Sequence, residues 1–307
     1  MKNLKLILIV FVALLIVGAA DAQKYELKFN LAPGTNWKAK QSSIMDINQQ
    51  VMGMSNDMKM TVEAITAYSV DKVVDGNFYL TFTYDAMLMK IESPMMNLSY
   101  DSSQPVDAQN PFSNSLGSMI GEKFEVVMDS KGKVMSVNGF DRIMDKMMKS
   151  VGGDNGAKDQ VIASVKQQFG DDAIKGSIEM STALFPASEV AIGDTWIVES
   201  VVPVNVELKS KSTLTLKDVK DGKWYLEGTS VLNSNKDAAI QANGMTQHMD
   251  LKGTSAFKTE VNSTTGWVVE SVVNQNIEGV VVIEGGQLPS SMEIPMKIKG
   301  TTTVTAM

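Results

Sequence analysis

Apolar and polar residues alternate one by one along most of the chain beyond residue 23. The alternation is clearest over residues 78–88 (FYLTFTYDAML), and it returns over 58–68, 196–208, 267–273 and 292–298. A period of two places successive side chains on opposite faces of a β-strand. Strands with one apolar and one polar face are typical of antiparallel sheets. The pattern therefore predicts a chain built largely of antiparallel strands.

Turn signals separate these strands. Asp75-Gly76 and Asp221-Gly222 each lie between two alternating segments. A tight hairpin turn there needs the positive φ that glycine adopts without strain. Longer loops that end at Gly132 and Gly266 separate two further pairs of strands. We expect a β-hairpin at each of these sites.

The middle of the chain has a helical pattern instead. Apolar residues with a spacing of three and four lie at Phe140, Ile143, Met144, Met147 and Met148. This spacing predicts an amphipathic helix. Weaker helical patterns follow over 161–169 and 174–184. Residues 140–185 are therefore expected to form a helical connector.

The segments on either side of this connector resemble each other. Three pairs of motifs recur in the same order: 34–37 with 193–196, 75–80 with 221–226, and 124–134 with 257–268. Repetition of this kind indicates a duplicated unit, although short turn motifs also recur by chance in all-β proteins. The predicted fold is all-β, or β-dominated α+β. It has two similar lobes of antiparallel, curved β-sheet, residues 23–139 and 186–307, joined by the helical connector.

Residues 1–22 have the features of a signal peptide. Lys2 and Lys5 precede the apolar run 6–17, and Ala20 and Ala22 supply the small residues of a cleavage site. The alternative is an uncleaved membrane anchor, but the run is shorter than the ~20 residues that a spanning helix needs. We therefore expect an exported protein of the periplasm or outer cell envelope, or one that is secreted, with no transmembrane segment in the mature chain.

Composition excludes several classes of function. The chain has 307 residues and is 44% hydrophobic and 21% charged, which is typical of a folded protein. Its net charge of −7 disfavours nucleic acid as a partner. Because the chain contains no cysteine, it can form neither disulfides nor thiolate sites.

Catalytic motifs are missing from the sequence. The single histidine, His248, has no serine in a G-x-S-x-G motif to act with, and neither H-E-x-x-H nor a phosphate-binding glycine loop occurs. Asp171 and Asp172 stand near the start of a predicted helix, where the helix dipole explains them better than a catalytic pair does. We expect a protein that is not an enzyme and has no cofactor or resident metal. A carboxylate-based hydrolase is the remaining enzyme alternative.

Methionine is unusually abundant. The chain has 22 methionines, and after the predicted signal peptide methionine outnumbers leucine. Methionine fills irregular cores, but it also lines adaptable apolar sites and provides a soft ligand for Cu(I). These three uses remain open. The candidate ligand-binding residues are Met52, Met54, Met58, Met60, Met87, Met89, Met144, Met147 and Met148.

Several motifs resemble those of a known family. They are Pro33-Gly34-x-x-Trp37, Tyr100-Asp101-Ser102, Gly121-x-x-Phe124, Phe185-Pro186 and Val190-x-x-Gly193-Asp194-x-Trp196. The sequence resembles a family of secreted envelope proteins found mainly in Bacteroidota and described only as a domain of unknown function. The resemblance implies an envelope location and no catalytic site. By looser analogy, it implies the curved sheet and helical lid of periplasmic lipoprotein carriers.

Two functional hypotheses follow. The first is a non-enzymatic exported binding protein whose methionine-lined apolar groove holds lipid, acyl or hydrophobic peptide ligands. The alternative is a structural or assembly component of the cell envelope that contacts a protein partner through sheet edges or surface residues. Cu(I) binding through methionine pairs is a minor alternative.

Overall fold

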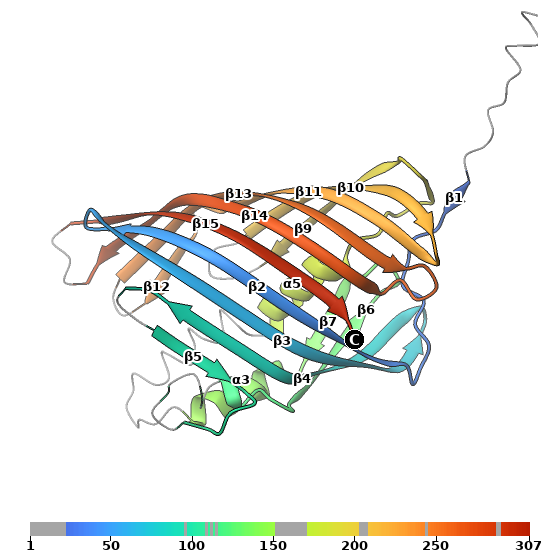
Figure 1. The fold of residues 1–307 in the computed structure, drawn as a ribbon, viewed down its shortest axis with the longest axis horizontal. Coiled ribbons are helices and arrows are strands. Elements are labelled where there is room, and N and C mark those ends of the chain that lie inside the picture. Colours follow the sequence, from blue (N-terminus) through green and yellow to red (C-terminus); the bar gives the residue numbers. More distant parts are fainter. Residues whose placement is uncertain are drawn as a thin grey trace, which may run out of the picture.

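The computed structural model describes residues 23–94, 97–107, 110, 113, 116–150, 171–202, 208–242, 245–286 and 290–307. The predicted signal peptide, 1–22, and the predicted helix at 161–169 lie outside these residues. In the described part the chain forms one large antiparallel sheet that curls around two helices (Figure 1). The prediction of an all-β or β-dominated fold is therefore confirmed.

The strands vary greatly in length, and the longest reach 21 residues. They are β1 (Lys24–Tyr25), β2 (Asn36–Val51), β3 (Met54–Val74), β4 (Asn77–Glu92), β5 (Asn97–Asp101), β6 (Lys123–Met128), β7 (Val134–Asn138), β8 (Val190–Ala191), β9 (Thr195–Val202), β10 (Leu208–Lys220), β11 (Lys223–Ser234), β12 (Ala239–Ala242), β13 (Met245–Asn262), β14 (Val268–Gly285) and β15 (Met292–Ala306). The helices are α3 (Phe140–Ser150) and α5 (Asp171–Thr182).

The sheet runs in the order β7-β6-β4-β3-β2-β15-β14-β13-β11-β10-β9. β5 pairs with β4 and β12 with β13, while β1 and β8 form a separate small sheet. The two halves of the chain share one sheet, because β15 pairs with β14 on one side and with β2 on the other. The division into two lobes therefore stays a prediction about sequence repeats and does not correspond to two separate sheets.

The two halves have equivalent strand orders. Neighbouring strands run β2-β3-β4-β6-β7 in the first half and β9-β10-β11-β13-β14 in the second. Matching loops are closed in the same way: the Gly34 N–H donates to the Val70 carbonyl at 2.8 Å, and the Gly193 N–H donates to the Leu216 carbonyl at 2.7 Å. The repeated sequence motifs thus occupy corresponding places in the sheet.

The predicted Asp-Gly turns have the expected backbone. Asp75 and Asp221 adopt φ values of 50° and 52°, and a positive-φ glycine follows each of them. Aspartate tolerates this left-handed conformation better than most residues. Met52, in the turn between β2 and β3, has a φ of 52° as well, which is unusual for methionine.

Glycines on the inner face of the sheet accept large side chains from the next strand. A Cβ atom on Gly228 would lie 2.3 Å from the ring of Phe257, its cross-strand neighbour. A Cβ on Gly253 would similarly lie 2.8 Å from Ile277. The side chains of Phe257 and Ile277 thus lie over glycine backbone that carries no side chain. This close approach allows the inner face to be strongly concave.

The core fills one end of this concave sheet. Trp37 stacks on Tyr68 with ring centroids 5.4 Å apart, and the ring of Trp267 lies 4.4 Å from that of Trp37. The segment after β1 covers this end, where Leu27 and Phe29 are buried. Packed side chains thus cover the inner face at this end of the sheet, which we call the aromatic end.

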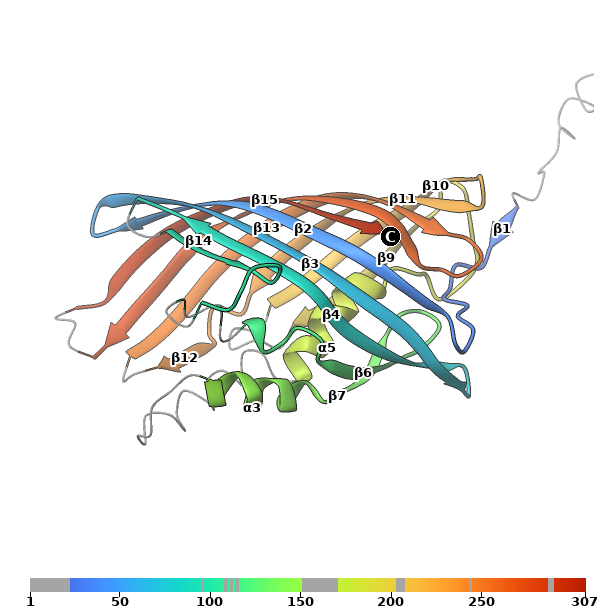
Figure 2. The ribbon, with the colours of Figure 1, turned by 60° about the horizontal axis from the view of Figure 1, so that its bottom comes forward.

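The two helices pack on the concave side. α3 inserts the buried Ile143 and Met144 into the core, as its apolar spacing predicts. α5 packs against both β7 and β9, the two end strands of the sheet, and so joins its two edges (Figure 2). Within the described residues, neither helix has the length and apolar character that crossing a membrane requires.

Candidate ligand-binding cavity

A cavity of about 730 Å³ lies between the concave face of the sheet and α5. Its aromatic end is formed by Tyr68, Phe82, Phe124 and Trp267. Tyr68 contacts Phe82 edge to face, with centroids 4.6 Å apart, and Trp267 at 5.1 Å. These rings form a rigid, apolar floor.

Two tyrosines that line the cavity remain uncharged over the physiological pH range. Burial raises the pKa of Tyr68 to about 12, and a hydrogen bond with Thr66 offsets this effect only in part. Burial also raises the pKa of Tyr84. Both phenols thus stay protonated, because a phenolate would lose its hydration inside the cavity.

A row of polar side chains crosses four neighbouring strands of the sheet. Ser212, Ser230, Ser255 and Gln275 are direct cross-strand neighbours on β10, β11, β13 and β14, and all four line the cavity. We call this set the polar row. Within it, the Ser212 and Ser230 hydroxyl oxygens are 2.5 Å apart and share a hydrogen bond.

Apolar rows flank the polar row on both sides. Leu214, Phe257 and Val273 lie toward the aromatic end, and Leu232 and Ile277 lie toward the other end. These five residues also line the cavity. Because side chains two residues apart on a strand share a face, β14 reads apolar, polar, apolar through Val273, Gln275 and Ile277, whereas β10 has Ser210 beside Ser212.

α5 supplies the remaining wall with Ile174, Ser177, Ile178, Met180 and Ser181. Its attachments to the β6–β7 side are hydrogen bonds. The Val134 N–H donates to Glu179 Oε2 at 3.1 Å, and Thr182 Oγ1 donates to the Gly132 carbonyl at 2.6 Å. On the other side, Trp196 Nε1 donates to the Leu184 carbonyl just beyond the helix at 2.9 Å. These contacts hold α5 over the opening between the sheet edges.

The part of the cavity wall that the structure describes carries no formal charge. Among the described residues that line it there is no Asp, Glu, Lys, Arg or His. Charged residues are instead exposed on the outer face, as in the pair Lys211–Glu199 at 3.0 Å. The interior therefore accommodates uncharged groups and offers no partner to an ion.

The structure separates the nine predicted methionines. Met87 lines the cavity. Met52 and Met54 lie at the tip of the β2–β3 hairpin with 76% and 69% of their surface exposed, so they do not contribute to the wall. Both thioethers are therefore exposed at the tip of this hairpin.

Four others take different places. Met58, Met60 and Met89 are half-buried on the same sheet face as the cavity residue Val62, but outside the wall itself. Met144 is 1% exposed in the core and faces no cavity. The side chains of Met147 and Met148 lie outside the described part of the structure. The continuous methionine lining expected from the sequence is therefore replaced by serine, threonine and aromatic residues.

The titratable residues considered from the sequence lie on different elements, His248 on β13 and Asp171 at the start of α5. His248 is half-buried on β13, between Ala239 of β12 and Val282 of β14. Asp171 Oδ1 accepts a hydrogen bond from the Phe140 N–H, which is a structural role. No group of three His, Asp or Glu side chains in the described ranges could hold a metal ion. Cu(I) binding by methionine pairs stays a prediction.

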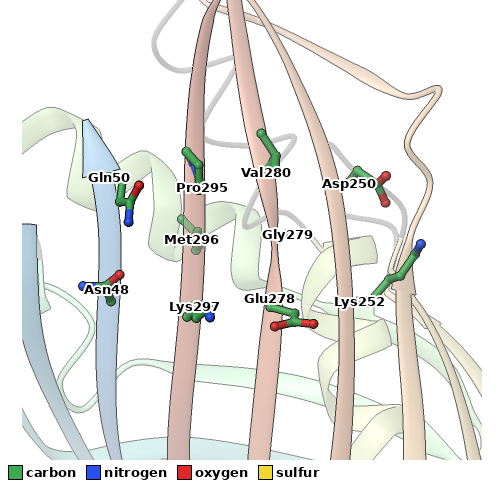
Figure 3. Close-up of a pocket in the computed structure, with 10 residues that line it drawn as sticks. All are labelled: Asn48, Gln50, Asp250, Lys252, Glu278, Gly279, Val280, Pro295, Met296 and Lys297. Carbon is green, nitrogen blue, oxygen red and sulfur yellow. The ribbon is translucent and has the colours of Figure 1, made fainter. Parts of the chain in front are cut away.

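A second, smaller depression of about 330 Å³ lies on the outer face of the sheet (Figure 3). Figure 3 shows Gln50, Lys297, Glu278, Asp250 and Lys252 on four neighbouring strands. These residues alternate with those that face the cavity, so they point to the opposite side. Val280, Pro295 and Met296 also line this depression, so charged and apolar side chains meet there.

The curled sheet and its uncharged interior define a β-sheet protein with a cavity of ligand size. The chain belongs to a family of unknown function, DUF6263, whose sequence model matches residues 75–268. The predicted membership of a family of unknown function is confirmed at this level, while a Bacteroidota origin and secretion stay predictions. No curated protein matches the sequence.

The comparison with solved structures found the following similarities. A structure described as showing lipid–protein interactions in lipovitellin is 8% identical, with a TM-score of 0.50, over 91% of this chain and 25% of that one. The chain thus spans about a quarter of lipovitellin. An outer membrane channel from Pseudomonas putida F1 is 6% identical with a TM-score of 0.26, over 95% of this chain and 100% of the channel. At 8% identity, the lipovitellin structure shows a similar fold alone.

Proposed function

We propose that this protein is a non-enzymatic binding protein that holds a lipid, acyl chain or hydrophobic peptide segment inside the curled sheet. The observation that carries the proposal is the cavity of about 730 Å³ with an uncharged wall. Ligand sites in proteins typically measure roughly 300–1,000 Å³ and are mostly apolar. The lipid contacts described for lipovitellin, whose fold is similar, support the same ligand class.

The expected affinity is moderate. A ligand of about 25 heavy atoms, at about 0.3 kcal/mol per atom, binds with about 7.5 kcal/mol. This free energy corresponds to a Kd in the low micromolar range. An affinity of this order suits a carrier or accessory factor that must both take up and release its ligand. The predicted signal peptide supports a location of this activity in the cell envelope or outside the cell.

The test is a titration with N-phenyl-1-naphthylamine, an uncharged fluorophore that brightens in apolar sites. The substitution Ala64→Trp adds an indole to the cavity wall, and Ile65→Trp adds the same group to the neighbouring residue on the outer face. We expect at least tenfold weaker binding for Ala64→Trp and unchanged binding for Ile65→Trp. Equal binding by both variants, with melting temperatures like that of the wild type, would contradict the proposal.

The second candidate function is an assembly role through the sheet edge. It rests on β9, an end strand, where Ile197 and Val201 are 57% and 45% exposed on the outer face. Exposed apolar residues on an end strand favour pairing with another chain. Cross-linking in the intact envelope, with the wild type and with Ile197→Lys, distinguishes this role. An assembly role predicts that Ile197→Lys loses a cross-linked partner, whereas the carrier function predicts no such loss.

A further inference from the structure

The polar row crosses the cavity wall between two sets of apolar residues, Leu214, Phe257 and Val273 on one side and Leu232 and Ile277 on the other, and this order restricts the kind of ligand. Each hydroxyl can donate one hydrogen bond and accept two. In the pair formed by Ser212 and Ser230 one O–H donates to the other oxygen, so the second O–H remains for another acceptor. The cavity therefore offers at least one hydrogen-bond donor between two apolar surfaces.

Further hydroxyl groups surround this pair. Ser255 and Gln275 continue the polar row across β13 and β14. Thr259 and Ser271 form a second cross-strand pair, with oxygens 2.8 Å apart, closer to the aromatic end. Hydroxyl and amide groups recognise ester, amide and alcohol oxygens, and they do so without any net charge on either partner.

The uncharged wall excludes ionised groups from the interior. A carboxylate or phosphate buried there would lose its hydration without gaining a cationic partner, which is strongly unfavourable. The two cavity tyrosines cannot compensate, since they carry no positive charge. An ionised headgroup would have to remain outside the cavity.

Resting on the proposed function, we propose that the natural ligand is an uncharged lipid that carries ester, amide or hydroxyl oxygens between apolar portions. Its oxygens contact the polar row, and its hydrocarbon lies against the apolar rows on either side. Fatty acids and other lipids whose charged group would enter the cavity are poor ligands. The carboxylate is excluded by the protein's own wall, so this selectivity needs no gate.

The experiment compares three probes of equal chain length by displacement of N-phenyl-1-naphthylamine at pH 8: methyl decanoate, decanoate and decane. We expect methyl decanoate to bind at least tenfold more tightly than decanoate, and two- to tenfold more tightly than decane. The second ratio corresponds to one hydrogen bond of about 0.5–1.5 kcal/mol. Binding of decanoate as tight as that of its methyl ester would overturn the inference and leave the proposed function intact.

A pair of double variants tests the polar row directly. Ser212→Ala with Ser230→Ala removes both hydroxyls of one pair, so neither is left without its partner. Thr213→Ala with Thr229→Ala changes the exposed pair next to it on the outer face of the same two strands. We expect the serine variant to lose two- to tenfold in affinity for methyl decanoate and nothing for decane, and the threonine variant to lose neither.

The outcomes separate the two proposals. If no probe displaces the fluorophore and the fluorophore itself does not bind, the proposed function is wrong. If all three probes bind but the serine variant weakens methyl decanoate and decane equally, the polar row acts only through shape, and the inference about ligand chemistry is wrong.

Discussion

Tyr68 makes the stability of this protein sensitive to alkaline pH, because the cavity keeps its phenol protonated. The pKa of Tyr68 is raised from 10.0 to about 12 by burial. Below pH 10 both the folded and the unfolded chain hold the phenolic proton, and its full contribution to stability is present. Between pH 10 and 12 the unfolded chain loses the proton while the folded protein keeps it, so the free energy of unfolding falls as pH rises.

The size of the effect follows from the shift of about two units, which corresponds to about 2.7 kcal/mol at about 1.36 kcal/mol per unit. Tyr68→Phe retains the ring that packs against Trp37, Phe82 and Trp267 but has no proton to lose. At pH 12, the pKa of Tyr68 in the folded protein, most of this difference has developed, so urea unfolding from pH 8 to pH 12 should show a loss of stability about 2.3 kcal/mol smaller in Tyr68→Phe than in the wild type.

A control and a contrary result complete this test. Tyr79→Phe removes a tyrosine beside the exposed Lys72, outside the cavity. The reasoning fails if wild type and Tyr68→Phe lose stability in parallel over the whole pH range. That result would mean that the Tyr68 hydroxyl reaches water and that the aromatic end of the cavity is wet.

Three further changes probe the packing around the cavity. Glu179→Ala removes the acceptor for the Val134 N–H and should lower the free energy of unfolding by about 1–3 kcal/mol in urea titrations. The control Glu199→Ala, in an exposed ion pair, should lower it by less than about 1 kcal/mol. Equal losses in the two variants would contradict the anchoring of α5 by Glu179. Gly228→Val forces a side chain against the Phe257 ring and should destabilise by about 1–3 kcal/mol in thermal unfolding, and a neutral result would show that the sheet relaxes there. By differential scanning calorimetry, Met144→Ala should lower the free energy of unfolding by about 2–5 kcal/mol, and Met52→Ala by no more than about 0.5 kcal/mol. Similar losses in the two variants would be incompatible with the different burial of the two side chains.

Local patterns in the sequence predicted the secondary structure well. Alternation, Asp-Gly turns and the apolar spacing from Phe140 depend on residues close in sequence, and the corresponding strands, turns and α3 are all present. The pairing of β15 with β2 joins residues from Met296 and Gln49 to Ala306 and Ala39, which are 247 to 267 positions apart. No local pattern encodes such a pairing, so the sequence left open whether the two halves share a sheet.

The cavity was harder to predict, because its wall breaks the rule that inward residues are apolar. Serines of the polar row resemble solvent-facing residues in the sequence, although they face the interior. On β4 a change of register between Tyr84 and Ala86 turns Met87, rather than Leu88, to the side of Phe82. Strict alternation placed Leu88 on that side, and a bulge of this kind leaves no clear mark in the sequence.

The methionines show the limit of composition as evidence. Their abundance suggested a methionine-lined groove, but side chains of this type lie at an exposed turn, in the buried core and in the cavity wall. Only the long-range strand pairing decides which of them meet.

The helical pattern in the sequence indicated α5 only weakly, although its Met180 lines the cavity.

Native mass spectrometry of the protein purified from its own cell envelope, without added detergent or lipid, tests the central claim most directly. The account predicts a complex heavier than the polypeptide by the mass of one uncharged lipid, which Ala64→Trp loses and Ile65→Trp retains. A polypeptide that carries no bound lipid in any of the three proteins would contradict it.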